Sequence, residues 1–192
     1  MRPRIGFITL GKAPWVAEKS VEALRRDALS AIRKQPVDLC VVDGIPYSVD
    51  EVMEATRLFK KEDVDAVLVF HADWTYGELY CVLAKELSEY PIIQWGIYGS
   101  QKSIIPLPGL FESAGNMMRL GKKFFHVIGD PGEKDTVERI FKLANAAAVA
   151  KKLRRSTVGV AGASNLGMTD TGFSEFHIRR LVPGLLHLDT SE

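Results

Sequence analysis

Short apolar runs rich in β-branched residues alternate along this chain with longer segments of helical periodicity. This alternation constrains the fold more than any other feature, because strands joined by helices predict right-handed crossovers in an open α/β fold. The run at residues 66–70, Ala-Val-Leu-Val-Phe, is apolar throughout, as expected for a parallel strand covered on both faces. The strands of the first part are expected at residues 5–10, 37–42, 66–70, 91–95 and 123–128.

The helical segments carry start and stop signals. Capping boxes at residues 48–51 (Ser-Val-Asp-Glu) and 75–78 (Thr-Tyr-Gly-Glu) predict two helix starts. Asp130-Pro131 predicts the start of a long helix, and Gly121 predicts the end of the helix before it. The helices are expected at about residues 14–34, 48–62, 75–88, 111–120 and 130–155.

The element order predicts two parts. Residues 1–155 are expected to form one N-terminal α/β domain, an open, doubly wound parallel sheet of the Rossmann or flavodoxin type. Residues 156–192 repeat the pattern as an appended β-α-β unit. Because one such unit cannot bury both faces of its sheet, it must pack on the first domain, pair with another chain, or begin a second domain.

Composition excludes several functions. The chain has 192 residues, with 25 Lys and Arg against 24 Asp and Glu, so it lacks the basic excess of a nucleic-acid binder. No apolar run approaches the ~18 residues of a membrane span, and no signal peptide is expected. Cys40 and Cys81 lie in apolar segments, which indicates free, buried thiols in a reducing, cytoplasmic protein.

Ligands of open α/β sheets bind at the carboxyl ends of the strands, so the loops that follow the strands are the candidate site. His71 and Asp73 follow a strand, but no third ligand lies nearby in sequence, so no metal site is expected. The loop 162–167 lacks G-x-G-x-x-G spacing, which favours a structural turn over nucleotide binding. The candidate loops are residues 9–14, 43–47, 71–75, 96–109 and 129–133.

Trp74 allows two interpretations. It can act as a hydrophobic staple that packs on Leu79 and sets the direction of the following helix. It can equally act as an aromatic platform that covers the apolar C–H face of a sugar. A hydrolase or transferase based on His71 and Asp73 is less favoured, because no nucleophile lies beside them.

Five stretches in succession have a familiar order and spacing along almost the whole chain: Trp74-Thr-Tyr-Gly77, Ile92–Gly99, Gly159–Met168, Phe173–Phe176 and Leu188–Glu192. Together they resemble the L-fucose isomerase and L-arabinose isomerase family, whose members are aldose–ketose isomerases. The resemblance covers only the family's N-terminal region. It implies that residues 156–192 are the truncated start of a second α/β domain.

The resemblance also implies a chemistry. The family moves hydrogen between C1 and C2 of a sugar through an enediol, which a divalent metal, usually Mn²⁺, stabilises. The first domain of one subunit covers the active site of its neighbour, and the aromatic residue that matches Trp74 contacts the sugar. Tyr76, His71 and Asp73 would lie beside it, and Lys12 loosely matches a basic residue after the first strand.

The family's metal ligands belong to later domains, so no catalytic or metal-binding residue is expected here, and Mn²⁺ is expected only in a complete active site. The expected function is the substrate-covering part of a metal-dependent sugar isomerase in carbohydrate metabolism, inactive alone. Its expected partners are a sugar and either copies of itself or a separately encoded catalytic half. The alternative is a noncatalytic sugar-binding or interaction protein derived from that family.

Overall fold

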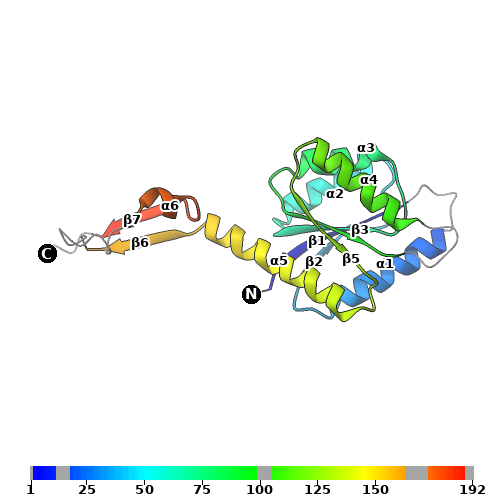
Figure 1. Ribbon diagram of the computed structural model, residues 1–192, viewed down its shortest axis with the longest axis horizontal. Helices are drawn as coiled ribbons and strands as arrows, with labels where there is room; N and C mark the ends of the chain where they lie inside the picture. The colour runs from blue at the N-terminus through cyan, green and yellow to red at the C-terminus, as the bar shows by residue number, and fades with distance from the viewer. Residues whose placement is uncertain (1, 12–17, 99–104, 163–172, 189–192) are drawn as a thin grey trace. The chain divides into compact units, whose positions relative to one another are not determined.

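A computed structural model describes residues 2–11, 18–98, 105–162 and 173–188 of the chain. The chain divides into two compact units, Met1–Ala147 and Ala148–Glu192. The first unit contains a five-stranded sheet and the second a two-stranded sheet (Figure 1). Lys12 and the loop 163–167 lie outside the described residues.

The described elements follow the alternation seen in the sequence. In chain order they are β1 (Arg4–Leu10), α1 (Glu18–Arg33), β2 (Asp38–Val41), α2 (Val49–Lys61), β3 (Ala66–His71), α3 (Gly77–Glu86), β4 (Ile92–Gly96), α4 (Pro106–Arg119), β5 (Phe124–Ile128), α5 (Lys134–Arg154), β6 (Thr157–Ala161), α6 (Glu175–Arg179) and β7 (Gly184–Leu188).

The sheet of the first unit has the order β2-β1-β3-β4-β5, and all its pairings are parallel. The chain leaves β1 toward β2 on one side and returns to β3 on the other, so the order reverses between β1 and β3. The expected open, doubly wound parallel sheet is confirmed. In such sheets the point of reversal, at the carboxyl ends of the strands, is where ligands bind.

Helices cover both faces of this sheet (Figure 1). α1 and α5 pack on one face, where Phe70 and Trp95 lie at the centre of the apolar core. α2, α3 and α4 pack on the other face around Phe59 and Leu83. Every residue of β3 is buried, as its apolar sequence predicts.

Two of the four helix signals act as predicted. At α2 the Ser48 side chain accepts a hydrogen bond from the Glu51 N–H, and the Glu51 carboxylate accepts from the Ser48 N–H, so that capping box is confirmed. Gly121 follows α4 with a φ of 68°, the left-handed conformation that ends many helices.

The other two helix starts are wrong. α3 begins at Gly77 with Tyr76 as its N-cap, and no side chain caps it. Thr75 is fully buried, so its hydroxyl lies in the protein interior rather than over the first turn of the helix. α5 begins at Lys134, because residues 130–133 form a turn in which the Glu133 N–H donates to the Asp130 carbonyl over 3.0 Å.

The second unit pairs β6 with β7 in parallel, joined through α6. Most residues of both strands are exposed, and none is fully buried. A two-stranded sheet of this kind is marginally stable by itself. That it represents the start of a second domain stays a prediction.

Two expectations from composition can also be compared with the structure. Cys40 and Cys81 are free thiols, but both are only partly buried, so the prediction that they are buried is wrong. Among the described residues, no helix combines the length and the apolar character that crossing a membrane requires.

Candidate functional site

The loop that follows β3 lies at the reversal point of the sheet. The Ala72 N–H donates to the carbonyl of Leu10 at the end of β1 over 3.0 Å. Gly11 approaches Asp73 so closely that a β-carbon at residue 11 would lie 3.7 Å from the Asp73 β-carbon. The ends of β1 and β3 therefore meet where the fold places a ligand site.

Trp74 is half-buried in this loop and its ring is held from two sides. The indole Nε1–H donates a hydrogen bond to the carboxylate of Glu112 on α4. The Tyr76 ring meets the indole edge-on, with 5.5 Å between ring centroids and an angle of 67° between the planes. Tyr76 itself is 41% exposed. The structure thus brings together an aromatic pair with one partly open side.

Helix α4 fixes the backbone of the loop. A β-carbon at Gly109 would lie 2.7 Å from the Asp73 carbonyl oxygen and 3.1 Å from the Trp74 α-carbon. A β-carbon at Gly77 would lie 2.8 Å from a carboxylate oxygen of Glu112. Real β-carbons do not approach backbone atoms as closely as 2.7 Å, so the contact of α4 with Asp73 depends on glycine at residue 109. The carboxylate that faces Gly77 ends a flexible side chain and can move aside.

Asp73 is fully buried and ties the loop together. One carboxylate oxygen, Oδ1, accepts hydrogen bonds from the Trp74 N–H over 2.8 Å and from the Ile105 N–H over 2.7 Å. The second oxygen, Oδ2, is buried without a hydrogen-bond partner among the described groups. Asp73 thus joins the end of β3 to the start of α4, and contact with a substrate stays a prediction for it.

His71 is also fully buried, in the core between the sheet and α3. Its ring packs against Tyr80 with 5.6 Å between centroids, and neither ring nitrogen has hydrogen-bond geometry with a described group. Burial lowers the pKa of His71 to about 3, with the neighbouring Gln94 amide opposing the shift. The imidazole is therefore neutral in ordinary buffers, and it is closed to solvent.

Of the five residues expected to bind substrate, the structure therefore brings four into one region, with Trp74 and Tyr76 outermost. Glu112 is a fifth member of this region that sequence reasoning missed. It is 38 residues from Trp74, and no local pattern marks it. The alternative packing of Trp74 on Leu79 stays a prediction.

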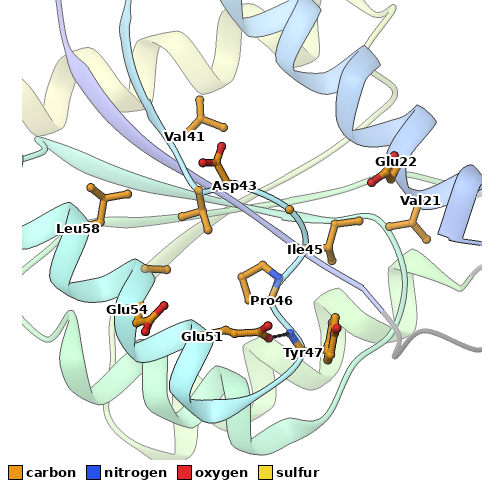
Figure 2. Close-up of a pocket in the computed structure, with 13 residues that line it drawn as sticks. Val21, Glu22, Val41, Asp43, Ile45, Pro46, Tyr47, Glu51, Glu54 and Leu58 are labelled. Carbon is orange, nitrogen blue, oxygen red and sulfur yellow. Dashed lines mark hydrogen bonds between the residues drawn. The ribbon is translucent and has the colours of Figure 1, made fainter.

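The sequence also did not predict a cavity that the structure contains. A cavity of about 630 Å³ lies between α1, α2 and the loop after β2 (Figure 2). Trp74 does not line it. The loop 43–47 was among the candidate loops, but its sequence gave no indication of a cavity.

Metal binding needs several converging ligands. Within the described ranges, no group of three or more His, Cys, Asp or Glu side chains is arranged to hold a metal ion.

The geometry defines an open α/β protein with an aromatic loop at the reversal point of its sheet. No protein-family model matches the chain. The chain is distantly related to a sugar isomerase: it is 24% identical over 186 residues to sulfoquinovose isomerase of Priestia aryabhattai and, equally, to that of Priestia megaterium. The match covers 94% of this chain but only 41% of each relative.

Solved structures resemble the chain more loosely. A crystal structure of FixJ-N has a TM-score of 0.44 at 14% identity, covering 76% of this chain and 95% of that one. A periplasmic solute-binding protein of Actinobacillus succinogenes with bound D-allose has a TM-score of 0.37 at 16% identity, and the match covers 98% of this chain and 58% of that one. A type B ribose 5-phosphate isomerase mutant from Trypanosoma cruzi has a TM-score of 0.30 at 9% identity, and the match covers 77% of this chain and 98% of that one. The sheet topology of the first unit defines the fold class.

Proposed function

We propose that this chain is the substrate-covering part of an aldose–ketose isomerase of the L-fucose and L-arabinose isomerase type, with Trp74 stacked on the sugar. The observation that carries the proposal is the relation to sulfoquinovose isomerase along 94% of this chain. This chain spans about two fifths of the length of those relatives, so the proposal concerns one part of such an enzyme.

The geometry of the loop supports this role. An indole ring covers the apolar C–H face of a sugar well, and it does so best when its orientation is fixed before binding. The hydrogen bond from Trp74 to Glu112 and the edge contact with Tyr76 fix that orientation. The Tyr76 hydroxyl, on a ring that is 41% exposed, offers a polar group beside the platform.

The metal-dependent step is not assigned to this chain. Isomerases of the proposed type polarise the two substrate oxygens with Mn²⁺ acting as a Lewis acid. The described residues do not fit such an ion, because they present no converging set of three ligands. We place the ligands in a separate part of the enzyme, supplied by another copy or by a separately encoded catalytic half. The two free cysteines favour a reducing, cytoplasmic setting.

The second candidate function is a noncatalytic sugar-binding or interaction protein derived from the same family. The same lack of a converging ligand set favours it. The two candidates differ in what accompanies the chain. A neighbouring reading frame with paired carboxylates and a histidine would support the split enzyme, and a genome without one would support the binding protein.

An assay of ketose formation tests whether this chain lacks the metal-dependent step. The purified chain is incubated with L-fucose, L-arabinose or sulfoquinovose, with and without Mn²⁺. We expect no turnover in any combination, because the metal ligands lie elsewhere. Metal-dependent turnover by this chain alone would contradict the proposal, since it would require a complete site within these residues.

Sugar binding tests the role of Trp74 directly, through the backbone NMR signals of Tyr76 and Gly77, which every variant retains. We expect the three sugars to shift these signals. Trp74→Ala should lose at least about tenfold in affinity, the loss of one stacking contact, and Trp74→Phe should lose less because it keeps an aromatic face. Phe125→Ala removes a half-exposed ring on β5 and serves as the control. Equal losses in sugar affinity and in unfolding free energy on Trp74→Ala would instead favour a purely structural role.

A further inference from the structure

The cavity beside β2 has the size and form of a small-molecule site. Its volume of about 630 Å³ lies within the range of roughly 300–1,000 Å³ typical of ligand pockets. Figure 2 shows that its wall comes from three separate segments: α1, the loop after β2, and α2. It also opens at the carboxyl end of a strand, where open α/β sheets bind ligands.

The lining combines apolar walls with carboxylates. Val41, Ile45 and Leu58 supply apolar surface, and Asp43 and Glu54 lie over it as exposed carboxylates. Glu22 on α1 adds a third exposed carboxylate on the facing wall. None of the lining residues that the structure describes is a lysine or an arginine.

In the part of the chain that the structure describes, no ion pair joins the carboxylates of Glu22, Asp43 or Glu54 to a basic side chain. Arg25 on α1 donates a hydrogen bond from Nη2 to the carbonyl of the lining residue Val42 over 2.7 Å, so one guanidinium group lies close to the cavity. The described lining residues, which include Glu51 as a fourth carboxylate, still carry an excess of negative charge.

Tyr47 and Glu51 complete one end of the cavity. The Glu51 carboxylate is already occupied, since it accepts hydrogen bonds from the backbone N–H groups of Tyr47 and Ser48 over 3.0 and 3.1 Å. These bonds lower the pKa of Glu51 and hold the Tyr47 backbone in place. The Tyr47 ring is 47% exposed, and the face of an aromatic ring attracts a cation.

The donor and acceptor pattern selects the ligand. The charged side chains that line the cavity are carboxylates, which only accept hydrogen bonds when ionised, so they favour a ligand that donates. A neutral polyol both donates and accepts, and an anion would be repelled. We propose that this cavity binds a small aliphatic amine, with its protonated amino groups on Asp43, Glu54 and Glu22 and its methylene chain against the apolar wall.

This inference is independent of the proposed sugar contact at Trp74, because the two sites share no residue. It is tested with three matched five-carbon probes: 1,5-diaminopentane, 1,5-pentanediol and glutarate. Each is titrated at constant ionic strength while the backbone NMR signals of Gly44 and Tyr47 are followed. We expect saturable shifts with the diamine only. Saturation by the diol to the same extent, or absence of a response to the diamine, would overturn the proposal.

Charge-removing variants locate the binding. Asp43→Asn and Glu54→Gln keep the shape of the cavity and should each weaken diamine binding by about threefold, the effect of one exposed charge pair. Asp135→Asn removes an exposed carboxylate on α5, outside the cavity, and is the matched control. Equal losses of diamine affinity in all three variants would show that binding follows the net charge of the protein, and would overturn the proposed site. Intact NMR signal dispersion shows that each variant is folded.

Discussion

At the scale of single residues, the loop after β3 separates two kinds of polar side chain. His71 and Asp73 point into the protein and are fully buried, whereas Trp74 and Tyr76 are partly open to solvent. The sequence placed all four at the end of one strand, because strand and loop assignments are local. It could not tell which were buried, because Asp73 is contacted by α4 from more than thirty residues away and His71 packs against Tyr80 on α3.

The buried His71 predicts a pH-dependent stability. Its pKa is about 3 in the folded state and 6.5 unperturbed, so the unfolded state binds the proton more tightly. The contribution of neutral His71 to the unfolding free energy is therefore fully present above pH 6.5 and declines as the pH falls toward 3. From pH 7.5 to pH 5 we expect a loss of about 2 kcal/mol in unfolding free energy from this group, measured by urea denaturation.

Two substitutions check the assignment to His71. His71→Gln should flatten the pH dependence between pH 7.5 and 5, even if it lowers stability overall. His126→Gln removes an exposed histidine on β5 and should keep the wild-type pH dependence. An unchanged slope in His71→Gln would contradict the assignment.

At the scale of elements, helix α2 follows its sequence signal and helix α3 does not. Ser48 and Glu51 are both only partly buried and form their reciprocal bonds. Thr75 and Glu78 have the same spacing, but the packing of the loop under α4 buries Thr75 and moves the helix start to Gly77. A capping box is thus a reliable signal only where tertiary packing leaves its hydroxyl free.

The cap of α2 has a measurable contribution. Ser48→Ala removes the oxygen that accepts from the Glu51 N–H and should lower the unfolding free energy by about 1 kcal/mol. Ser30→Ala, at an exposed position within α1, should change it by less than about 0.5 kcal/mol. Denaturant unfolding of both variants gives the comparison, and equal effects would argue against a role for the cap.

Helix α4 contains a matched pair of glycines. Gly109→Ala places a β-carbon against the backbone of Asp73 and Trp74 and should destabilise the protein by about 1–3 kcal/mol. Gly115 has nothing within 4 Å of its β-carbon position, so Gly115→Ala should stabilise the helix by about 0.5–1 kcal/mol.

Thermal or urea unfolding measures both glycine variants. The Trp74 indole N–H signal should also shift in Gly109→Ala, because the loop must move, and stay in place in Gly115→Ala. Opposite signs of the two stability changes are the expected result. Similar signs would mean that α4 does not pack on the loop as the structure has it.

At the scale of the whole molecule, the two units differ in how well they bury their strands. β3 and β4 are fully buried between two helical layers, whereas β6 and β7 are largely exposed. The apolar residues of the second unit follow the same trend, with Phe176 82% and Leu181 65% exposed. The first unit therefore has a core of its own, and the second has little.

Hydrogen exchange should reflect this difference. In this protein of 192 residues, the backbone amides of β6 and β7 should exchange at least about a hundredfold faster than those of β3 and β4. The reason is that small exposed sheets open locally at low free-energy cost. Mass spectrometry of deuterated peptides resolves the two regions. Comparable protection in both would indicate that the second unit is covered, by a partner copy or by other contacts.

The sequence by itself determined the element order, the parallel sheet, the buried central strand and the loop that carries Trp74. These follow from periodicity and capping, which act over a few residues. Only the tertiary structure decided that Glu112 holds Trp74, that Thr75 and His71 are buried, and that a cavity opens beside β2. Each of these depends on helices that pack on the sheet from distant positions, and that packing is governed by side-chain shape across the fold rather than by any local pattern.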